Sequence, residues 1–304
     1  MNQTKIKRAS EKVRKDFLSY LTEHSAALYA ILESSANRID RIVINHSQDG
    51  IVKTETLPIL QETVNNTMLH VRPAAGRYIV ASMKKSADFG LIAGIVSLAA
   101  ISEKNIDIGT SFINADGKII RFDAAKQTFA DSKWAAWQTD IVDELLVYKK
   151  TGIGVSDTIY DITRQAEKTL NANIGTAVLI GTGLKEINDI TRKALIGENR
   201  SVLTQLETFE TVKAQAAFNA GITKYAEERG VVVGFISRVH TNNPEPYDKS
   251  IDGLYFPKGL EPDPPYHFGC QCTLEPVVDE PPVELWADED QRRGYDFWMA
   301  KHAA

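Results

Sequence analysis

Apolar residues recur every three or four positions through most of the first 230 residues, a spacing that predicts amphipathic helices. From Lys5 to about Asn45 this spacing continues without a proline, so we expect one long helix with a break near Ser34-Ser35. A second helix is predicted from Pro58 to Leu69, because proline suits a first helical turn. Pro73 is expected to separate it from a helical pair that runs to Ile101.

The spacing of apolar residues changes between residues 106 and 122. Two short apolar runs, Ile106 to Ile113 and Ile119 to Phe122, flank the dipeptide Asp116-Gly117. An Asp-Gly pair between apolar runs is a strong short-range signal for a hairpin, because both residues tolerate the positive φ of a tight turn. The sequence therefore predicts a short β hairpin in the middle of a helical chain.

Helical spacing resumes after this hairpin. Gly181-Thr182-Gly183 is interpreted as a break between two helices and not as a dinucleotide-binding loop, because Glu186 stands where the third glycine of such a loop would be. Gly230 is expected to end the last helix of this series. The predicted helices run from Trp134 to a stop at Gly152 and Gly154, from Ser156 to Leu170 with Ser156 as the N-cap, from Gly183 to Leu195, and from about Ser201 to Arg229.

Beyond Gly230 the chain takes on the composition of β structure. Val231 to Val239, Leu254 to Phe256 and Cys270 to Val278 are short apolar runs bounded by turn residues and prolines. We expect them to form a compact three-stranded β unit packed behind the long helix that precedes it. The acidic, aromatic tail after Pro282 is expected to form a terminal helix.

These patterns predict an α+β protein that is mainly α-helical, with long amphipathic helices, a small C-terminal three-stranded β unit and a short mid-chain hairpin. A hydrophobic content of 43% is normal for a globular chain with a sizeable core. We divide the chain into a helical N-terminal region (1–150), a core of helices plus the β unit (151–280) and an acidic aromatic tail (281–304).

The longest apolar run, Phe89 to Ile101, is far shorter than the roughly 20 residues that span a bilayer, so no membrane span is predicted. No apolar segment follows the basic start directly, so we expect no secretory signal peptide. Two cysteines do not make a disulfide framework, which favours synthesis in a reducing cytoplasm.

The chain has two cysteines, Cys270 and Cys272, which are separated by one residue, and His267 lies three residues before Cys270. Residues i and i+2 of a strand point to the same face, so both thiols could address one metal ion together with the imidazole. A closed structural zinc site needs four ligands, so this set is one short. The alternative is that the thiols and the imidazole only pack and hydrogen-bond within the β unit.

Charge is unevenly distributed, although the net charge is only −5. The start of the chain is basic and the tail is acidic and aromatic, which suggests contacts with DNA or protein partners at the two ends; the alternative is that these are solvated helix faces. The candidate DNA- or partner-binding residues are Lys5, Lys7, Arg8, Lys12, Arg14, Lys15, Trp286, Tyr295, Phe297 and Trp298.

Several segments between Gly152 and Val278 match one family pattern. They are the helix pair Ser156 to Leu170 and Gly183 to Leu195, Glu210-Thr211 with Ala217-Phe218-Asn219-Ala220-Gly221, Ser250-Ile251-Asp252-Gly253-Leu254-Tyr255, and Pro264-Pro265-Tyr266-His267 with Cys270-Gln271-Cys272-Thr273. In this order they resemble the Mu-F-like head morphogenesis proteins, the minor head proteins of tailed bacteriophages. The last segment, which resembles the family's closing Pro-Pro-x-His-x-x-Cys-x-Cys-Thr signature, is the most specific.

The chain departs from this family at one point. Many members carry a Cys-x-x-Cys just before the Asp-Gly turn, whereas the corresponding stretch here, Asn242 to Asp248, has no cysteine. A four-ligand zinc site would have to take its fourth donor from His240, Asp248 or Asp252. We therefore treat zinc as possible and no cofactor as required.

The resemblance implies a low-copy component of the phage head, assembled in the cytoplasm of the host bacterium. Its expected partners are the portal protein, the major capsid or scaffolding protein and, in some relatives, the packaged double-stranded DNA. The alternative is a DNA-binding or ejected internal virion protein.

A zinc- or cysteine-dependent enzyme is a weaker alternative. The sequence has no Gly-x-Ser-x-Gly, His-Glu-x-x-His or Walker motif. Cys270 and His267 could be imagined as a nucleophile pair, but no oxyanion site can be identified beside them. We predict that the chain is not an enzyme and has no catalytic residues.

Overall fold

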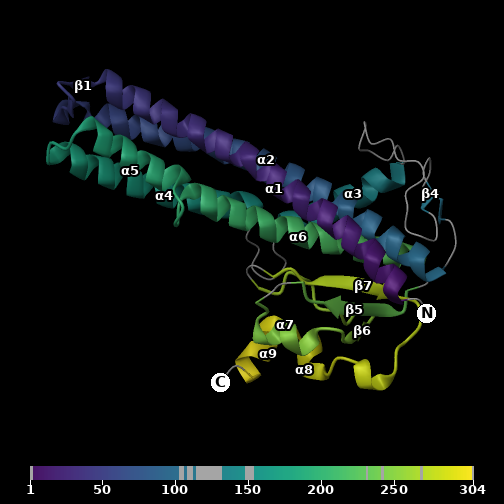
Figure 1. The fold of residues 1–304 in the computed structure, drawn as a ribbon. Coiled ribbons are helices and arrows are strands. Elements are labelled where there is room, and N and C mark those ends of the chain that lie inside the picture. The colour runs from purple at the N-terminus through teal and green to yellow at the C-terminus, as the bar shows by residue number, and fades with distance from the viewer. Residues whose placement is uncertain are drawn as a thin grey trace. The chain divides into compact units, whose positions relative to one another are not determined.

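The computed structural model describes residues 3–102, 106–107, 112–113, 132–147, 154–230, 232–240, 243–267 and 270–302. It confirms a mainly α-helical α+β fold with a small three-stranded sheet (Figure 1). The helices are α1 (Gln3–Asn45), α2 (Leu57–Ser102), α3 (Ser132–Leu146), α4 (Val155–Leu179), α5 (Leu184–Ile196), α6 (Val202–Arg229), α7 (Pro246–Ile251), α8 (Glu289–Arg292) and α9 (Tyr295–His302). The strands are β1 (Ser47–Gln48), β2 (Ile51–Val52), β3 (Ile106–Asp107), β4 (Phe112–Ile113), β5 (Gly234–Arg238), β6 (Tyr255–Pro257) and β7 (Thr273–Val277). A search of the described helices for a segment able to cross a bilayer finds none.

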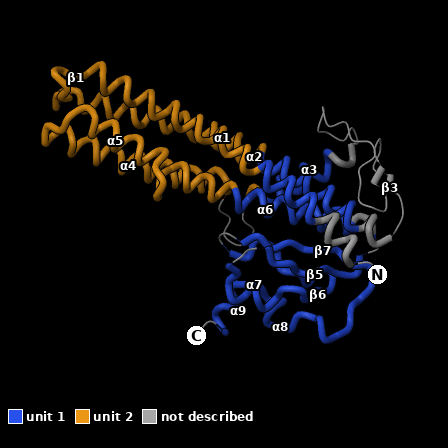
Figure 2. The backbone as a smooth tube through the Cα atoms, in the orientation of Figure 1, with its two compact units in different colours: residues 1–20, 82–145, 211–304 blue, residues 21–81, 146–210 orange. Residues whose placement is uncertain are grey.

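The chain forms two compact units, each built from segments that are distant in sequence (Figure 2). Unit 1 comprises residues 1–20, 82–145 and 211–304, and unit 2 comprises residues 21–81 and 146–210. The unit boundaries fall inside α1, α2 and α6, so these helices contribute residues to both. The sequence-based boundaries near residues 150 and 280 remain predictions.

Helix α1 continues through Ser34-Ser35, so the predicted break there is wrong. The hydroxyl of Ser35 donates to the carbonyl of Ile31 at 2.8 Å, one turn back in the same helix. A serine that returns its hydrogen bond to the i−4 carbonyl does not compete for the backbone amide and can remain inside a helix. Leu28, Leu32 and Ile39 are fully buried, and their packing keeps the helix continuous.

Helix α2 passes through Pro73, so the predicted separation into several helices is also wrong. Proline removes one backbone hydrogen bond, to the carbonyl of Leu69, and in a helix interior costs about 3 kcal/mol. The Leu69 side chain is 55% exposed, which places this part of the helix where water can solvate the carbonyl. Val71 and Ala75 are buried on the opposite side. Burial of that face outweighs the local preference for a break.

Unit 2 is held by polar contacts between helices. Arg72 of α2 donates to Thr163 at 2.9 Å and pairs with Glu167 of α4 at 2.7 Å. Arg192 of α5 bonds to Asn37 of α1 at 2.5 Å. These contacts orient helices whose apolar faces supply the core.

The ends of α4 differ from the prediction. Gly154, and not Ser156, is the N-cap, and its amide donates to the carboxylate of Asp157 at 2.9 Å. The helix continues past Leu170 to Leu179, and the predicted break follows at Gly181, which has a φ of +74°. Gly183 then caps α5, which confirms the interpretation of the Gly-Thr-Gly segment as a helix break.

The helices of unit 1 approach closely where two glycines meet. A Cβ atom on Gly90 of α2 would lie 1.9 Å from the carbonyl oxygen of Phe218, and one on Gly221 of α6 would lie 2.6 Å from that of Ala87. The rings of Phe17 and Phe218 stack beside this crossing, with centroids 4.6 Å apart. The absence of side chains at both glycines lets the two backbones touch.

The three-stranded sheet of unit 1 has the order β6-β5-β7 and is antiparallel throughout, with Ile236 of β5 opposite Tyr255 and Glu275. It lies between α6 on one side and α7, α8 and α9 on the other (Figure 1). This arrangement confirms the predicted β unit behind the long helix. The C-terminal tail forms two short helices where one was predicted.

The mid-chain hairpin is present as the pair β3 and β4, with Ile106 opposite Ile113. Both strands lie inside the run that was predicted to form only the first strand. The predicted turn at Asp116-Gly117 and the predicted second strand, Ile119 to Phe122, lie outside the described residues.

Lys213 of α6 gives unit 1 a pH-dependent stability. Its ammonium group donates to the carbonyl of Leu145 at 2.6 Å, and burial lowers the pKa of Lys213 to about 8. Between about pH 8 and pH 10.5 the unfolded chain therefore binds more protons at this lysine than the folded one, and stability rises with pH. We expect the difference in unfolding free energy between the wild type and Lys213→Met to move by roughly 1–3 kcal/mol in favour of the wild type from pH 7 to pH 10. Urea titrations of both proteins at the two pH values measure it, and a pH-independent difference would contradict the prediction.

Candidate metal centre

Three residues from two segments of unit 1 converge on one point. One ligand atom each from Asp248, His267 and Cys270 lies within 4.8 Å of the other two. Asp248 is in α7, whereas His267 and Cys270 belong to the loop that leads into β7. A carboxylate, an imidazole and a thiol at these separations are a donor set that can hold a metal ion.

Helix α7 positions Asp248, and sequence analysis missed this helix. Pro246 occupies its first turn, and the Asp248 carboxylate caps it by accepting from the amide of Glu245 at 3.2 Å. The signal was present as Pro-x-Asp after Asn242-Asn243, but the short span favoured interpretation as a turn. The side chain of Asp248 is completely buried, and its Oδ2 is 2.7 Å from Nε2 of His267.

The two cysteines lie beside this carboxylate, and both are buried. Cys272 Sγ donates to Asp248 Oδ1 at 3.4 Å, and the amide of Cys272 donates to Cys270 Sγ at 3.4 Å. Interaction with the Cys272 side chain and amide lowers the pKa of Cys270, against the opposing effect of burial. The interaction with Cys270 and burial raise the pKa of Cys272.

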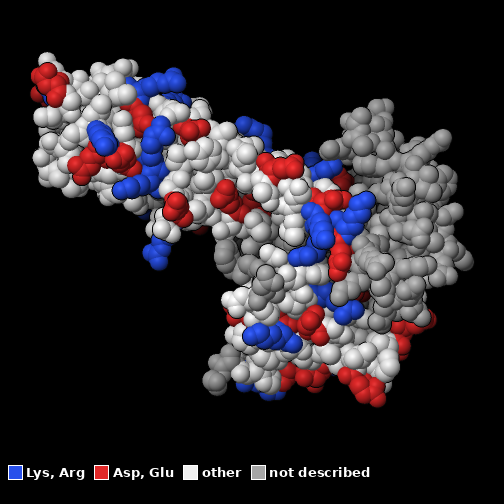
Figure 3. All heavy atoms as spheres, in the orientation of Figure 1, with Lys and Arg blue, Asp and Glu red and all other residues white. Residues whose placement is uncertain are grey.

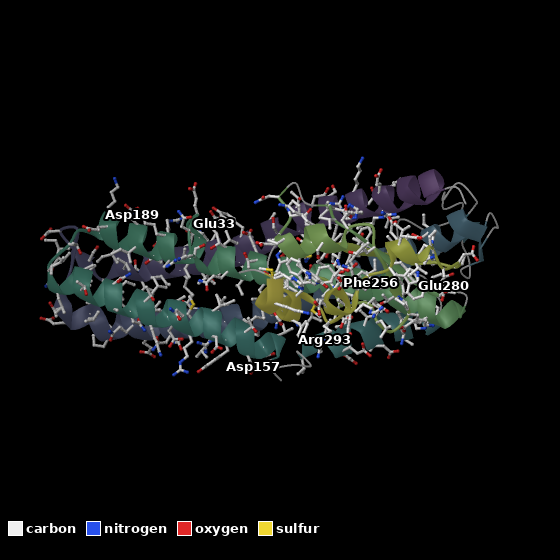
Figure 4. The ribbon with its side chains drawn as sticks, turned by 90° about the horizontal axis from the view of Figure 1, so that it is seen from below. Glu33, Asp157, Asp189, Phe256, Glu280 and Arg293 are labelled. Atoms are coloured by element: carbon white, nitrogen blue, oxygen red, sulfur yellow. The ribbon has the colours of Figure 1, made fainter. Side chains whose placement is uncertain are left out.

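Aromatic side chains pack around the cluster and leave only a small part of His267 exposed to water. The ring of Tyr247 meets those of Tyr266 and Tyr295 edge to face at 5.3 and 5.7 Å, and the His267 imidazole lies 5.2 Å from Tyr295. Burial raises the pKa of both Tyr247 and Tyr266. Phe256, labelled in Figure 4, belongs to the same apolar cluster as Tyr247. The cluster is enclosed, which suits a structural metal better than a site that must admit a substrate.

The three sequence candidates for a fourth ligand are in different places. His240 Nε2 is 2.8 Å from the hydroxyl of Thr273, and Asp252 Oδ1 accepts from the amide of Val239 at 3.0 Å. Within the described residues, Asp248 is the one of the three that joins His267 and Cys270. Spacing alone could not choose among them, because the choice depends on how α7 turns back toward β7.

Charged residues at the start of the chain show no concentrated basic surface among those that can be placed. Lys12 and Lys15 are exposed, whereas Arg14 bonds to Gln271 at 3.3 Å and its pKa is lowered by burial. On the face shown in Figure 3, positive and negative side chains are interspersed over the described residues of both units. The side chains of Lys5, Lys7 and Arg8 lie outside the described residues.

The tail aromatics pack within unit 1. Trp286 meets Tyr255 at 5.2 Å, and Arg293 lies 4.0 Å above the ring of Phe297. Tyr295 and Trp298 pack against the apolar cluster around Tyr247. In this structure these residues attach the tail to the β unit.

No protein-family model, curated protein sequence or solved structure matches this chain. The resemblance to the Mu-F-like proteins therefore rests on the sequence segments quoted above and stays a prediction. Within unit 1 the structure brings Asn219, of the Asn-Ala-Gly segment, into hydrogen-bond contact with the Cys-x-Cys-Thr segment and the residue after it.

Proposed function

We propose that this chain is a non-enzymatic assembly component of a bacteriophage head, present in few copies and docked on the portal during head morphogenesis. The observation that carries the proposal is the direct contact, within unit 1, between two of the segments that resemble the head morphogenesis family. Asn219, from the Asn-Ala-Gly helix, bonds through its side chain to the carbonyl of Cys272 and to the amide of Leu274, in and after the Cys-x-Cys-Thr segment.

The residues that match the family pattern lie at positions that build the β unit. Asn219 is 2% exposed, Cys272 is fully buried, and Asp252-Gly253 forms the turn in which Gly253 has a φ of +80°. Residues that carry a family pattern because they build a fold are buried and mutually bonded, whereas catalytic residues must reach a substrate. Their burial supports a role in which the unit acts as a scaffold for contacts with other proteins.

Exposed apolar side chains support a protein-binding role. Leu179 and Ile180, at the end of α4, are 68% and 71% exposed, and Ile51 of β2 is 48% exposed. The β1–β2 hairpin is tied to this end of unit 2, because the amide of Leu184 donates to the carbonyl of Gly50 at 2.9 Å. Large apolar residues that remain in water are available for contact with a partner. The proposed role requires no cofactor, and a bound zinc ion would be structural.

The proposal is tested in cells that produce the tagged full-length chain together with the head proteins of the phage that encodes it. We expect mass spectrometry of purified heads to find the chain at a few copies per head, and capture through the tag to recover portal protein. The variant Asn219→Ala, which damages the β unit, should be reduced in heads, whereas Asn173→Ala, at an exposed position of α4, should not. Heads that lack the wild-type chain, or capture of host proteins only, would refute the proposal.

A further inference from the structure

We propose that Asp248, His267, Cys270 and Cys272 bind one zinc ion that fastens α7 to the entry of β7. The site is structural, with all four positions filled by protein side chains. It is independent of the assembly role proposed above, because it concerns how unit 1 is held together and not what the unit contacts.

The positions of the donor atoms carry the first part of this inference. Zinc bonds of about 2.0–2.3 Å place neighbouring donors of a tetrahedral site roughly 3.3–3.8 Å apart. The ligand atoms of Asp248, His267 and Cys270 are within 4.8 Å of one another, so shifts of roughly 1 Å or less bring them to these separations. The closest pair, His267 Nε2 and Asp248 Oδ2 at 2.7 Å, would have to open by roughly 0.6 Å.

Cys272 is the fourth donor, although its sulfur lies outside the group of three whose ligand atoms are within 4.8 Å of one another and so has to move further than theirs. Its sulfur is 3.4 Å from Asp248 Oδ1, on the carboxylate that also meets His267. The amide of Cys272 points at Cys270 Sγ, so the backbone between the two cysteines already curves around a common point. Backbone N–H groups directed at a metal-bound sulfur are a usual outer-shell contact of thiolate sites.

Burial distinguishes this cluster from a surface group of acids and histidines. The side chain of Asp248 is 0% exposed and that of His267 is 12% exposed. A buried carboxylate is tolerated only where a cation or several hydrogen bonds compensate it. A zinc ion would replace the protons that now join the carboxylate to His267 and Cys272, while both thiols would release their protons to solvent and His267 would bind through Nε2.

The donor types select zinc. Two thiolates and one imidazole are soft or borderline ligands and disfavour magnesium and calcium, which take oxygen donors. A Cys2HisAsp set fills a tetrahedron and leaves no open position for water or substrate. The enclosing rings of Tyr247, Tyr266 and Tyr295 agree with a closed site.

The wild-type protein provides the first test, which needs no substitution. The full-length chain, purified without a metal-affinity tag, should carry one zinc ion per chain in native mass spectrometry at neutral pH. Removal of the ion by a chelator should lower the melting temperature, and added zinc should restore it. At free zinc about 100-fold above the dissociation constant we expect a difference of roughly 4 °C for a chain of 304 residues that unfolds as one unit. A chain that neither contains nor takes up zinc would overturn the proposal and leave a hydrogen-bonded cluster only.

Replacement of zinc with cobalt(II) allows the metal ligands to be identified by visible spectroscopy. The cobalt-loaded chain should show the visible bands of a tetrahedral ion and a thiolate-to-metal charge-transfer band, which Cys272→Ser should reduce to about half. Cys270→Ser and Asp248→Asn should weaken zinc binding at least tenfold, consistent with loss of one ligand. The matched controls are His302→Gln and Asp263→Asn, at exposed positions outside the cluster. Wild-type zinc content in both Cys270→Ser and Asp248→Asn would show that the ion binds elsewhere.

Discussion

Substitution of Asn219 with alanine is expected to lower the free energy of unfolding by about 2–4 kcal/mol. The Asn219 amide nitrogen donates to the carbonyls of Gln215 and Cys272, and its oxygen accepts from the amide of Leu274. Alanine leaves the buried Leu274 amide without this acceptor, and a buried unsatisfied group costs about 1–3 kcal/mol. A small cavity adds to this loss.

The position of β7 at the edge of the sheet explains why loss of the Asn219 side chain is expected to lower the stability of the protein. The strand order β6-β5-β7 makes β7 an edge strand, with β5 on one side only. The Cys272 carbonyl and the Leu274 amide face the other side, where the next strand of a larger sheet would pair. The carboxamide of Asn219 supplies one acceptor and one donor there, as a backbone peptide would. The Asn219 side chain thus satisfies the hydrogen-bonding groups at the free edge of β7 and joins this strand to α6.

Asn173→Ala in α4 is the matched control, because the same side chain is removed from a helix at an exposed position. Alanine is the better helix former by several tenths of a kcal/mol, so this variant should be neutral or slightly more stable. Urea unfolding monitored by circular dichroism compares the two. Equal stabilities for both variants would show that the Asn219 contacts with β7 do not stabilise the fold.

Substitution of Gly90 with alanine is expected to destabilise unit 1 by at least about 2 kcal/mol. The added Cβ would lie 1.9 Å from the carbonyl oxygen of Phe218 and 2.7 Å from its carbonyl carbon. Both are backbone atoms of a helix and cannot rotate away, so α2 and α6 must move apart. That movement also disturbs the stacked rings of Phe17 and Phe218 beside the crossing.

Gly76→Ala in the same helix is the control. Its new Cβ meets nothing closer than Ile159 Cδ1 at 3.9 Å, an ordinary contact. Because alanine is favoured over glycine in a helix interior by about 0.5–1 kcal/mol, this variant should gain stability. Thermal unfolding of both variants measures the contrast, and a Gly90→Ala protein as stable as Gly76→Ala would refute the close approach of the two helices.

Signals that depend on neighbours in the sequence predicted much of the fold. The helical spacing located the ends of α1 and α6 to within a few residues, and Gly230 follows α6 with a φ of +66° as expected. The β-rich composition after Gly230 predicted all three strands of the sheet. These features follow from side-chain periodicity and from the conformational freedom of glycine, which act over a few residues.

The sequence-based predictions were wrong where tertiary packing overrode the local conformational preference of a residue. Ser34-Ser35 and Pro73 are weak points for isolated helices, yet the helices continue because a whole face of each is buried. Helix α7 is only six residues long and has no periodicity to detect. Its capping depends on Asp248, the residue that also meets His267.

The sequence by itself determined the class of fold, the three strands of the sheet and the three candidate ligands His267, Cys270 and Cys272. Only the tertiary structure selected Asp248 from the three candidates for the fourth position and showed that Asn219 covers the edge of β7. The reason is physical: periodicity specifies which face of an element is buried, whereas a side-chain contact between segments tens of residues apart depends on how those faces pack.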